Sequence, residues 1–163
     1  MGDFGIVKSQ LSHTFATDSD MKDFTEQLQA MIDGNIPLVA AAMRIRLLSA
    51  TDTEVRARLP FEGNANDKGT LFAGAIFSLL VVSGWSLAMA RAFACGFERP
   101  WAAVVESSCS YKKALRADSV AVATFTEPAE PVVGARNWLQ VEVRIDDAVC
   151  FRGKYAVGQH ARK

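Results

Sequence analysis

The sequence predicts an α+β fold in which a curved antiparallel sheet wraps around one long central helix. Residues 71–90 carry no charged side chain, which indicates a long apolar helix. Segments before and after it alternate apolar and polar residues, as half-buried strands do. Strands that follow one another without intervening helices form a largely antiparallel sheet. A helix that is apolar on every side must be buried on every side, so we expect the sheet to curve around it.

The first predicted element is an amphipathic helix over residues 21–32. Its apolar side chains share one stripe: Phe24, Leu28, Met31 and Ile32. Asp18 or Ser19 can cap its start, and Gly34 with Pro37 ends it.

Strands are predicted on both sides of the apolar segment. From Leu38 the apolar period changes to two, which predicts strands around residues 43–47 and 55–59, with a turn at 49–53. The pair Asp146 and Asp147 indicates a tight hairpin between the last two strands of the chain. After the apolar segment we expect strands over residues 102–112, 119–126, 137–145 and 148–157.

The apolar segment itself is long enough to cross a bilayer. Two features favour a buried helix instead. Nearly half of residues 71–90 are small or hydroxylated, and the amphipathic strands on both sides need a shared core that this helix can supply. We therefore predict a soluble core helix over residues 70–94, covered by the sheet and by a second subunit, and not a membrane span.

Charge and cysteine content narrow the class of protein. The net charge is +0, whereas a nucleic-acid-binding protein usually carries a basic surface. The cysteines, Cys95, Cys109 and Cys150, are far apart and odd in number, so they form neither a disulfide framework nor a CxxC metal motif. This cysteine usage is typical of a reducing cytoplasm, where we expect the protein to act.

Two sequence motifs resemble a known family. "NANDKGTLFAG", followed by an apolar helix with "SGW", and the later "VVESSCSYKKAL" are similar to the putative thioesterases of the hotdog superfamily, a type also found behind an acetyltransferase domain. The similarity covers about residues 36–157. It implies a hotdog domain over residues 36–163, after an N-terminal segment and helix at 1–35. It also implies an acyl-thioester substrate, no cofactor except the coenzyme A of the substrate, and a homodimer or dimer of dimers.

The motif departs from its relatives at two positions. Relatives with the broader pattern carry Asn, Gly and then His-Gly-Gly, where this chain has Asn66, Gly69 and "FAG" at Phe72, Ala73 and Gly74. Many also place a catalytic acid about seven residues after the last glycine, where this chain has Val81. The usual histidine and helix carboxylate are therefore absent, and if the protein hydrolyses thioesters, an acid must come from outside the long helix.

The start of the predicted helix is the strongest candidate site. The first amides of a helix lack internal partners and carry partial positive charge, so they can stabilise a thioester carbonyl as it becomes an oxyanion. Phe72 and Ala73 would line this site. Gly74 would let the substrate approach the backbone, or it serves only close packing. Asn66 would hold water or the carbonyl, or it forms a turn.

Two carboxylates are candidates for the base that hydrolysis needs. Asp67 comes just before the helix, where its alternative role is an N-terminal cap. Glu106 interrupts the apolar strand "AAVVESSCS", and its alternative role is an exposed strand face. Of the two, Glu106 is favoured as the base, because a carboxylate within this strand is harder to explain structurally. Strand alternation puts Glu106, Ser108 and Ser110 on one face and Val105, Ser107 and Cys109 on the other.

The remaining candidates are binding residues. Ser108 shares the face of Glu106, and Ser83 lies within the helix, where it can instead bond back to the preceding turn. Lys112 and Lys113, with Arg116 and either Arg91 or Arg99, would meet the phosphates of coenzyme A, unless they belong to an ordinary solvated loop. The two histidines, His13 and His160, lie near the chain ends, which argues against a Ser-His or Cys-His dyad.

Two functions remain open on these grounds. The first is an acyl-thioester hydrolase acting on acyl-CoA or an acyl carrier protein. The second is a non-hydrolytic acyl-thioester binding or lyase-like protein, which the missing helix acid favours.

Overall fold

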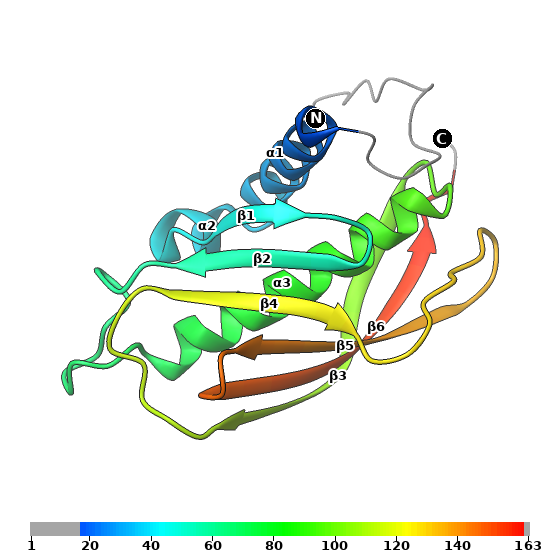
Figure 1. The fold of residues 1–163 in the computed structure, drawn as a ribbon. Helices are drawn as coiled ribbons and strands as arrows, with labels where there is room; N and C mark the ends of the chain where they lie inside the picture. Colours follow the sequence, from blue (N-terminus) through cyan, green and yellow to red (C-terminus); the bar gives the residue numbers. More distant parts are fainter. Residues whose placement is uncertain (1–16, 162–163) are drawn as a thin grey trace.

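The computed structural model describes residues 17–161 of the chain. Figure 1 shows a sheet that curves around one long helix. Along the chain the elements are α1 (Asp18–Asn35), α2 (Pro37–Met43), β1 (Arg46–Ala50), β2 (Glu54–Leu59), α3 (Ala73–Ala94), β3 (Pro100–Tyr111), β4 (Ser119–Phe125), β5 (Asn137–Ile145) and β6 (Val149–Gln159).

The sheet has the strand order β1-β2-β4-β5-β6-β3, and every neighbouring pair is antiparallel. Strand β2 illustrates how the sequence positions it. Val55, Ala57 and Leu59 are fully buried, whereas Arg56 and Arg58 between them are exposed. The predicted fold class, an antiparallel sheet wrapped around a central helix, is thereby confirmed.

Helix α3 is apolar and is buried on nearly all sides. Leu79, Leu80 and Leu87 have no exposed surface, and complete burial of one such side chain stabilises the fold by about 1.5–3 kcal/mol. Among the described residues, α3 is the one helix long and apolar enough to cross a membrane, with a mean hydropathy of 1.8. Of an 18-residue apolar stretch of this helix, 67% is buried inside the protein, as expected for a core helix.

A tyrosine from the sheet reaches the middle of α3. Tyr155 is fully buried, and its hydroxyl donates to the carbonyl oxygen of Val81 at 3.0 Å. A Cβ at Gly84 would overlap the Tyr155 hydroxyl, so only glycine lets β6 approach the helix here. On the other side, Trp85 Nε1 donates to the carbonyl oxygen of Ala102 in β3 at 3.1 Å.

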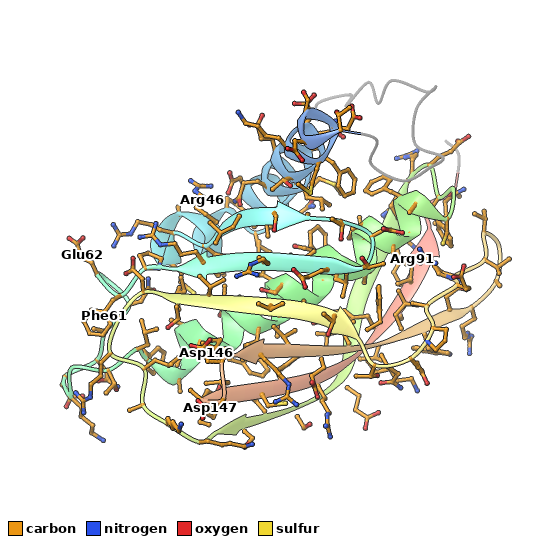
Figure 2. The ribbon with its side chains drawn as sticks, in the orientation of Figure 1. Arg46, Phe61, Glu62, Arg91, Asp146 and Asp147 are labelled. Carbon is orange, nitrogen blue, oxygen red and sulfur yellow. The ribbon has the colours of Figure 1, made fainter. Side chains whose placement is uncertain are left out.

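Arg91 in the last turn of α3, labelled in Figure 2, pairs with residues of two loops. Arg91 pairs with Asp52 at 2.6 Å in the turn between β1 and β2. It also pairs with Glu130 and donates to the carbonyl oxygen of Ala129, both in the loop between β4 and β5.

The N-terminal part of the fold differs from the prediction in three ways. The N-cap of α1 is Thr17, whose side chain accepts a hydrogen bond from the Asp20 amide, and not Asp18 or Ser19. Helix α1 continues through Asn35. The residues from Pro37 to Met43 form a second short helix and not the start of a strand. Proline suits the first helical position because that position needs no amide donor.

The remaining predictions of secondary structure are confirmed within a few residues. Strand β1 begins at Arg46, after Arg44 takes a positive φ of 55°. The β5–β6 hairpin turns at Asp146, with a φ of 45°, and both aspartates of the turn are visible in Figure 2.

Candidate functional site

The candidate site is the first turn of α3. The N-cap residue is Phe72, which has no side-chain oxygen to offer, and within residues 17–161 no side-chain hydrogen bond caps this end of the helix. The first amides of α3 therefore keep their donors and partial positive charge for another acceptor. Asp67, whose alternative role was to cap this helix, does not do so; it is exposed in the preceding loop.

Asn66 organises the loop that leads into the helix. Its side-chain oxygen accepts hydrogen bonds from the Lys68 amide at 3.0 Å and from the amide and hydroxyl of Thr70. Gly69 follows with a positive φ of 65°, a conformation that glycine adopts without strain. The oxygen of Asn66 thus serves the turn, the second of the roles that the sequence left open.

Gly74 has a specific neighbour. A Cβ at this position would overlap the ring of Phe72, so glycine lets that ring fold over the first turn of α3. The Phe72 ring is itself 55% exposed and lies at the rim of the site. A larger residue at position 74 would therefore displace an aromatic ring before it met any substrate.

Strand β3 runs beside the helix start and adds a hydroxyl to it. Tyr111 donates from Oη to the carbonyl oxygen of Ala73 at 3.3 Å. Partial burial, together with the neighbouring Cys109, raises the pKa of Tyr111 to about 12, so the hydroxyl stays protonated at neutral pH. Burial also raises the pKa of Cys109 and keeps it a thiol. The sequence pattern did not single out Tyr111; its one signal was the aromatic residue that ends "VVESSCSY".

A β-bulge decides which way Glu106 points. Val104 pairs with the buried Tyr155, but the register shifts before Glu106, which pairs with Lys154 on the outer face of the sheet. Glu106 and Ser108 therefore share a face, as predicted, and this face is turned away from α3. Ser107, Cys109 and Tyr111 pair with the buried residues Gly153, Phe151 and Val149 and so face the helix.

The other predicted binding residues lie in different surroundings. Ser83 is fully buried, and its Oγ donates to the carbonyl oxygen of Leu79 at 2.7 Å, which is the structural role considered for it. Lys112 is exposed after β3, and Lys113 pairs with Asp147, which lowers the pKa of that carboxyl. Arg116 donates to the carbonyl oxygen of Gly69.

The two arginines considered for the phosphates, Arg91 and Arg99, lie away from the helix start, and neither histidine is placed at it. Arg91 lies at the opposite end of α3 in its ion pairs. His160 donates its backbone amide to the carbonyl oxygen of Arg99, before the start of β3. His13 lies outside the described residues.

Several apolar side chains are exposed near the helix start and along β3. They come from the N-cap, from α3 and from the edge strand: Phe72, Phe77, Val104, Val105 and Tyr111. Phe77 is 38% exposed while its ring packs edge-to-face against Phe151, with 5.8 Å between ring centroids. The helix start therefore has exposed aromatic side chains beside it.

The chain matches a known protein family over most of its length. Residues 25–159 match the family described as "Putative thioesterase (yiiD_Cterm)". The match begins inside α1 and ends with β6, so it includes the helix start and the whole sheet.

Solved structures of similar fold carry related descriptions. A putative thioesterase from Shewanella oneidensis is 20% identical, with a TM-score of 0.71 over 83% of this chain and 98% of that one. A thioesterase from Haemophilus influenzae is 14% identical, with a TM-score of 0.63 over 82% and 89%. Zebra fish thioesterase superfamily member 2 is 16% identical, with a TM-score of 0.60 over 83% and 96%. At these identities the likeness establishes the shared fold.

Proposed function

The chain belongs to this family of putative thioesterases, and we propose that it hydrolyses acyl thioesters carried by coenzyme A or by an acyl carrier protein. The observation that carries the proposal is the start of α3, where no side chain of the described residues caps the first amides and the Tyr111 hydroxyl lies alongside. Exposed apolar side chains close to that point, Phe72 and Phe77 among them, offer contacts for an acyl group.

In the proposed reaction the thioester carbonyl oxygen lies against the first amides of α3. Water adds to the carbonyl carbon, the oxygen takes up negative charge, and the amides stabilise it. Tyr111, whose raised pKa keeps its hydroxyl protonated, exchanges its bond to Ala73 for one to this oxygen. The C–S bond then breaks, the sulfur leaves as a thiol after taking a proton, and the acyl group leaves as a carboxylic acid.

A base is needed to take the proton of the attacking water. Asp67 and Glu106 remain the two predicted carboxylates. Within one subunit the register supports Asp67, because Glu106 projects from the face of β3 opposite to α3. Asp67 is exposed in the loop before the helix, from which its side chain can approach the first turn.

We further propose that two copies pair through β3. This strand is an edge of the sheet, and most of its residues are exposed on both faces. Pairing would cover Val104, Val105 and the exposed part of Phe77. A dimer of dimers, which the family resemblance also implies, is proposed as the alternative assembly.

The proposed setting is the cytoplasm, and no cofactor is proposed apart from the coenzyme A of the substrate. Just after β3, Lys113 already pairs with Asp147. The exposed Lys112 is therefore the lysine proposed to bind a phosphate of coenzyme A.

A second function is favoured by one observation. Helix α3 has no carboxylate, and Glu106 faces outward, so a non-hydrolytic acyl-thioester binding or lyase-like protein would need no further residue. The deciding experiment is turnover of a panel of acyl-CoA thioesters, followed with a thiol-reactive dye. Thiol release that scales with protein concentration supports hydrolysis. Saturable binding of the same thioesters without thiol release supports the second function.

A further inference from the structure

Helix α1 lies along β1, the edge of the sheet opposite to β3 (Figure 1). An edge strand presents unpaired amides and carbonyls, which are a template for pairing with another chain. In this protein, side chains of α1 take the place of that other chain.

Gln29 imitates one peptide unit of a neighbouring strand. Its side-chain oxygen accepts from the Leu47 amide at 2.8 Å, and its side-chain nitrogen donates to the carbonyl oxygen of Ile45 at 3.4 Å. A strand added at this edge would make bonds with the same alternation of donor and acceptor. The carboxamide therefore occupies the pairing positions of this part of β1.

Thr25 binds the next backbone amide of β1 that points away from β2. Its hydroxyl accepts from the Ala50 amide at 3.0 Å and donates to the carbonyl oxygen of Met21 at 2.8 Å, so both of its functions are used. Between the positions held by Gln29 and Thr25, β1 bulges at Leu48, which further disturbs a regular edge.

Asp33 completes the row. Its carboxylate accepts from Gln29 Nε2 at 2.9 Å and pairs at 3.0 Å with Arg46, which Figure 2 shows on β1. Thr25, Gln29 and Asp33 are spaced four residues apart, so they form one stripe on the helix. The adjacent stripe, with Phe24, Leu28 and Ile32, packs into the core.

We propose that α1 is an edge cap. The stripe of Thr25, Gln29 and Asp33 closes β1 against strand pairing by a second copy of this chain, and it directs strand-mediated self-association to β3. A sheet open at both edges could add copies without limit, whereas pairing through β3 alone closes after one two-fold contact. The cap itself is independent of the proposed catalytic activity; the direction of pairing rests on the proposed β3 contact.

The test removes the cap and measures assembly by sedimentation velocity over a range of concentrations. Thr25→Val with Gln29→Met deletes the hydrogen bonds to β1 while keeping similar volumes. The matched control is Gln27→Met, which adds the same apolar side chain at an exposed position of α1. We expect the wild type and the control to form one closed species. The double variant should add species of about twice that mass and larger, increasing with concentration.

A third change tests whether β1 is the new contact. Leu48 is 51% exposed at the bulge, and a lysine on an edge strand opposes pairing. Leu48→Lys in the double variant should restore the wild-type distribution. If the larger species persist, general unfolding causes them and the proposal is overturned. A folded double variant that keeps the wild-type distribution at every concentration overturns it as well.

Two readouts keep the test decisive. Far-UV circular dichroism and a melting curve establish that the variants are folded, and if the double variant is not, Gln29→Met alone is tested in the same way. A wild type that sediments as a monomer overturns the direction of pairing to β3. Turnover is measured separately, so loss of the proposed hydrolysis leaves these outcomes unchanged.

Discussion

Strands β1 and β3 are the two edges of one sheet, yet their backbones meet different neighbours. Side chains of α1 bond to the outward groups of β1, whereas β3 carries exposed residues on both faces. The start of α3, with its uncapped amides, lies beside β3 and not beside β1. The open edge, β3, is therefore the edge next to the candidate site.

The largest expected effect concerns the base on the β3 side of the molecule. Asp67→Asn should lower turnover by about 10²–10⁴, since it removes a general base. Glu106→Gln should leave turnover close to that of the wild type, because its side chain faces away from α3. Both variants should melt near the wild-type temperature, as exposed residues usually do.

Thiol release from acyl-CoA, measured beside melting curves, checks this prediction. A large loss in Glu106→Gln alone would assign the base to the outer face of β3. Normal turnover in both single variants and in the double variant would contradict the carboxylate mechanism and favour a binding role.

The next effect concerns the open edge. Val105→Lys places a charge where two β3 strands would meet, with the partner's copy of the same charge nearby. Like charges at an interface cost several kcal/mol, so the dissociation constant of the pair should rise by about 10². Val132→Lys, at an exposed position in the loop between β4 and β5, is the matched control. Sedimentation equilibrium measures both, and unchanged association of Val105→Lys would exclude β3 as the contact.

A smaller effect is expected at the hydroxyl beside the helix start. Tyr111→Phe removes a neutral donor to a charged oxygen, a bond worth about 1.5–3 kcal/mol, so kcat should fall roughly ten- to a hundredfold. The factor should be constant through the neutral range, because the pKa of Tyr111 is raised to about 12. A wild-type kcat in Tyr111→Phe would leave this tyrosine only its bond to Ala73.

The same pKa has a consequence for stability. A tyrosine with a folded pKa above its unfolded value of about 10 stabilises the fold below that pH, and this contribution is lost as the pH rises toward the folded pKa. The melting temperature of the wild type should therefore fall more steeply above about pH 10 than that of Tyr111→Phe.

The smallest effect is the stability of the closed edge. Thr25→Ala leaves the buried Ala50 amide without its acceptor, which should cost about 1–3 kcal/mol. For a chain of this size each kcal/mol lowers the melting temperature by about 2–4 °C. Glu26→Ala, at the exposed neighbouring position, should change it little. Equal melting of the two variants would mean that Thr25 does not hold this edge.

Much of the fold could be read from periodicity. The uncharged run predicted a helix buried on nearly all sides, and the alternation at Val55, Ala57 and Leu59 predicted which face of β2 is buried. The prediction failed between Pro37 and Met43, where the residues form α2. A short apolar stretch suits a helix and a strand equally, and its neighbours decide between them.

The candidate site was less accessible to the sequence. Its motif located the helix start and the strand that passes it, and alternation correctly grouped Glu106 with Ser108. Asp67 was considered as a cap that the helix does not use. Tyr111 was missed because nothing in its local pattern predicts a contact with Ala73, which is 38 positions away in the chain.

The sequence by itself determined that α3 is a core helix, that strands surround it, and that Glu106 and Cys109 lie on opposite faces of one strand. A period of two or of 3.6 records which residues share a face, and apolar content records how deeply that face is buried. Only the tertiary structure decided that Glu106 faces outward, because a bulge at Val105 sets the register against β6. Only the tertiary structure brought Gln29 to the edge of β1, since that contact depends on where α1 packs and not on any pattern within it.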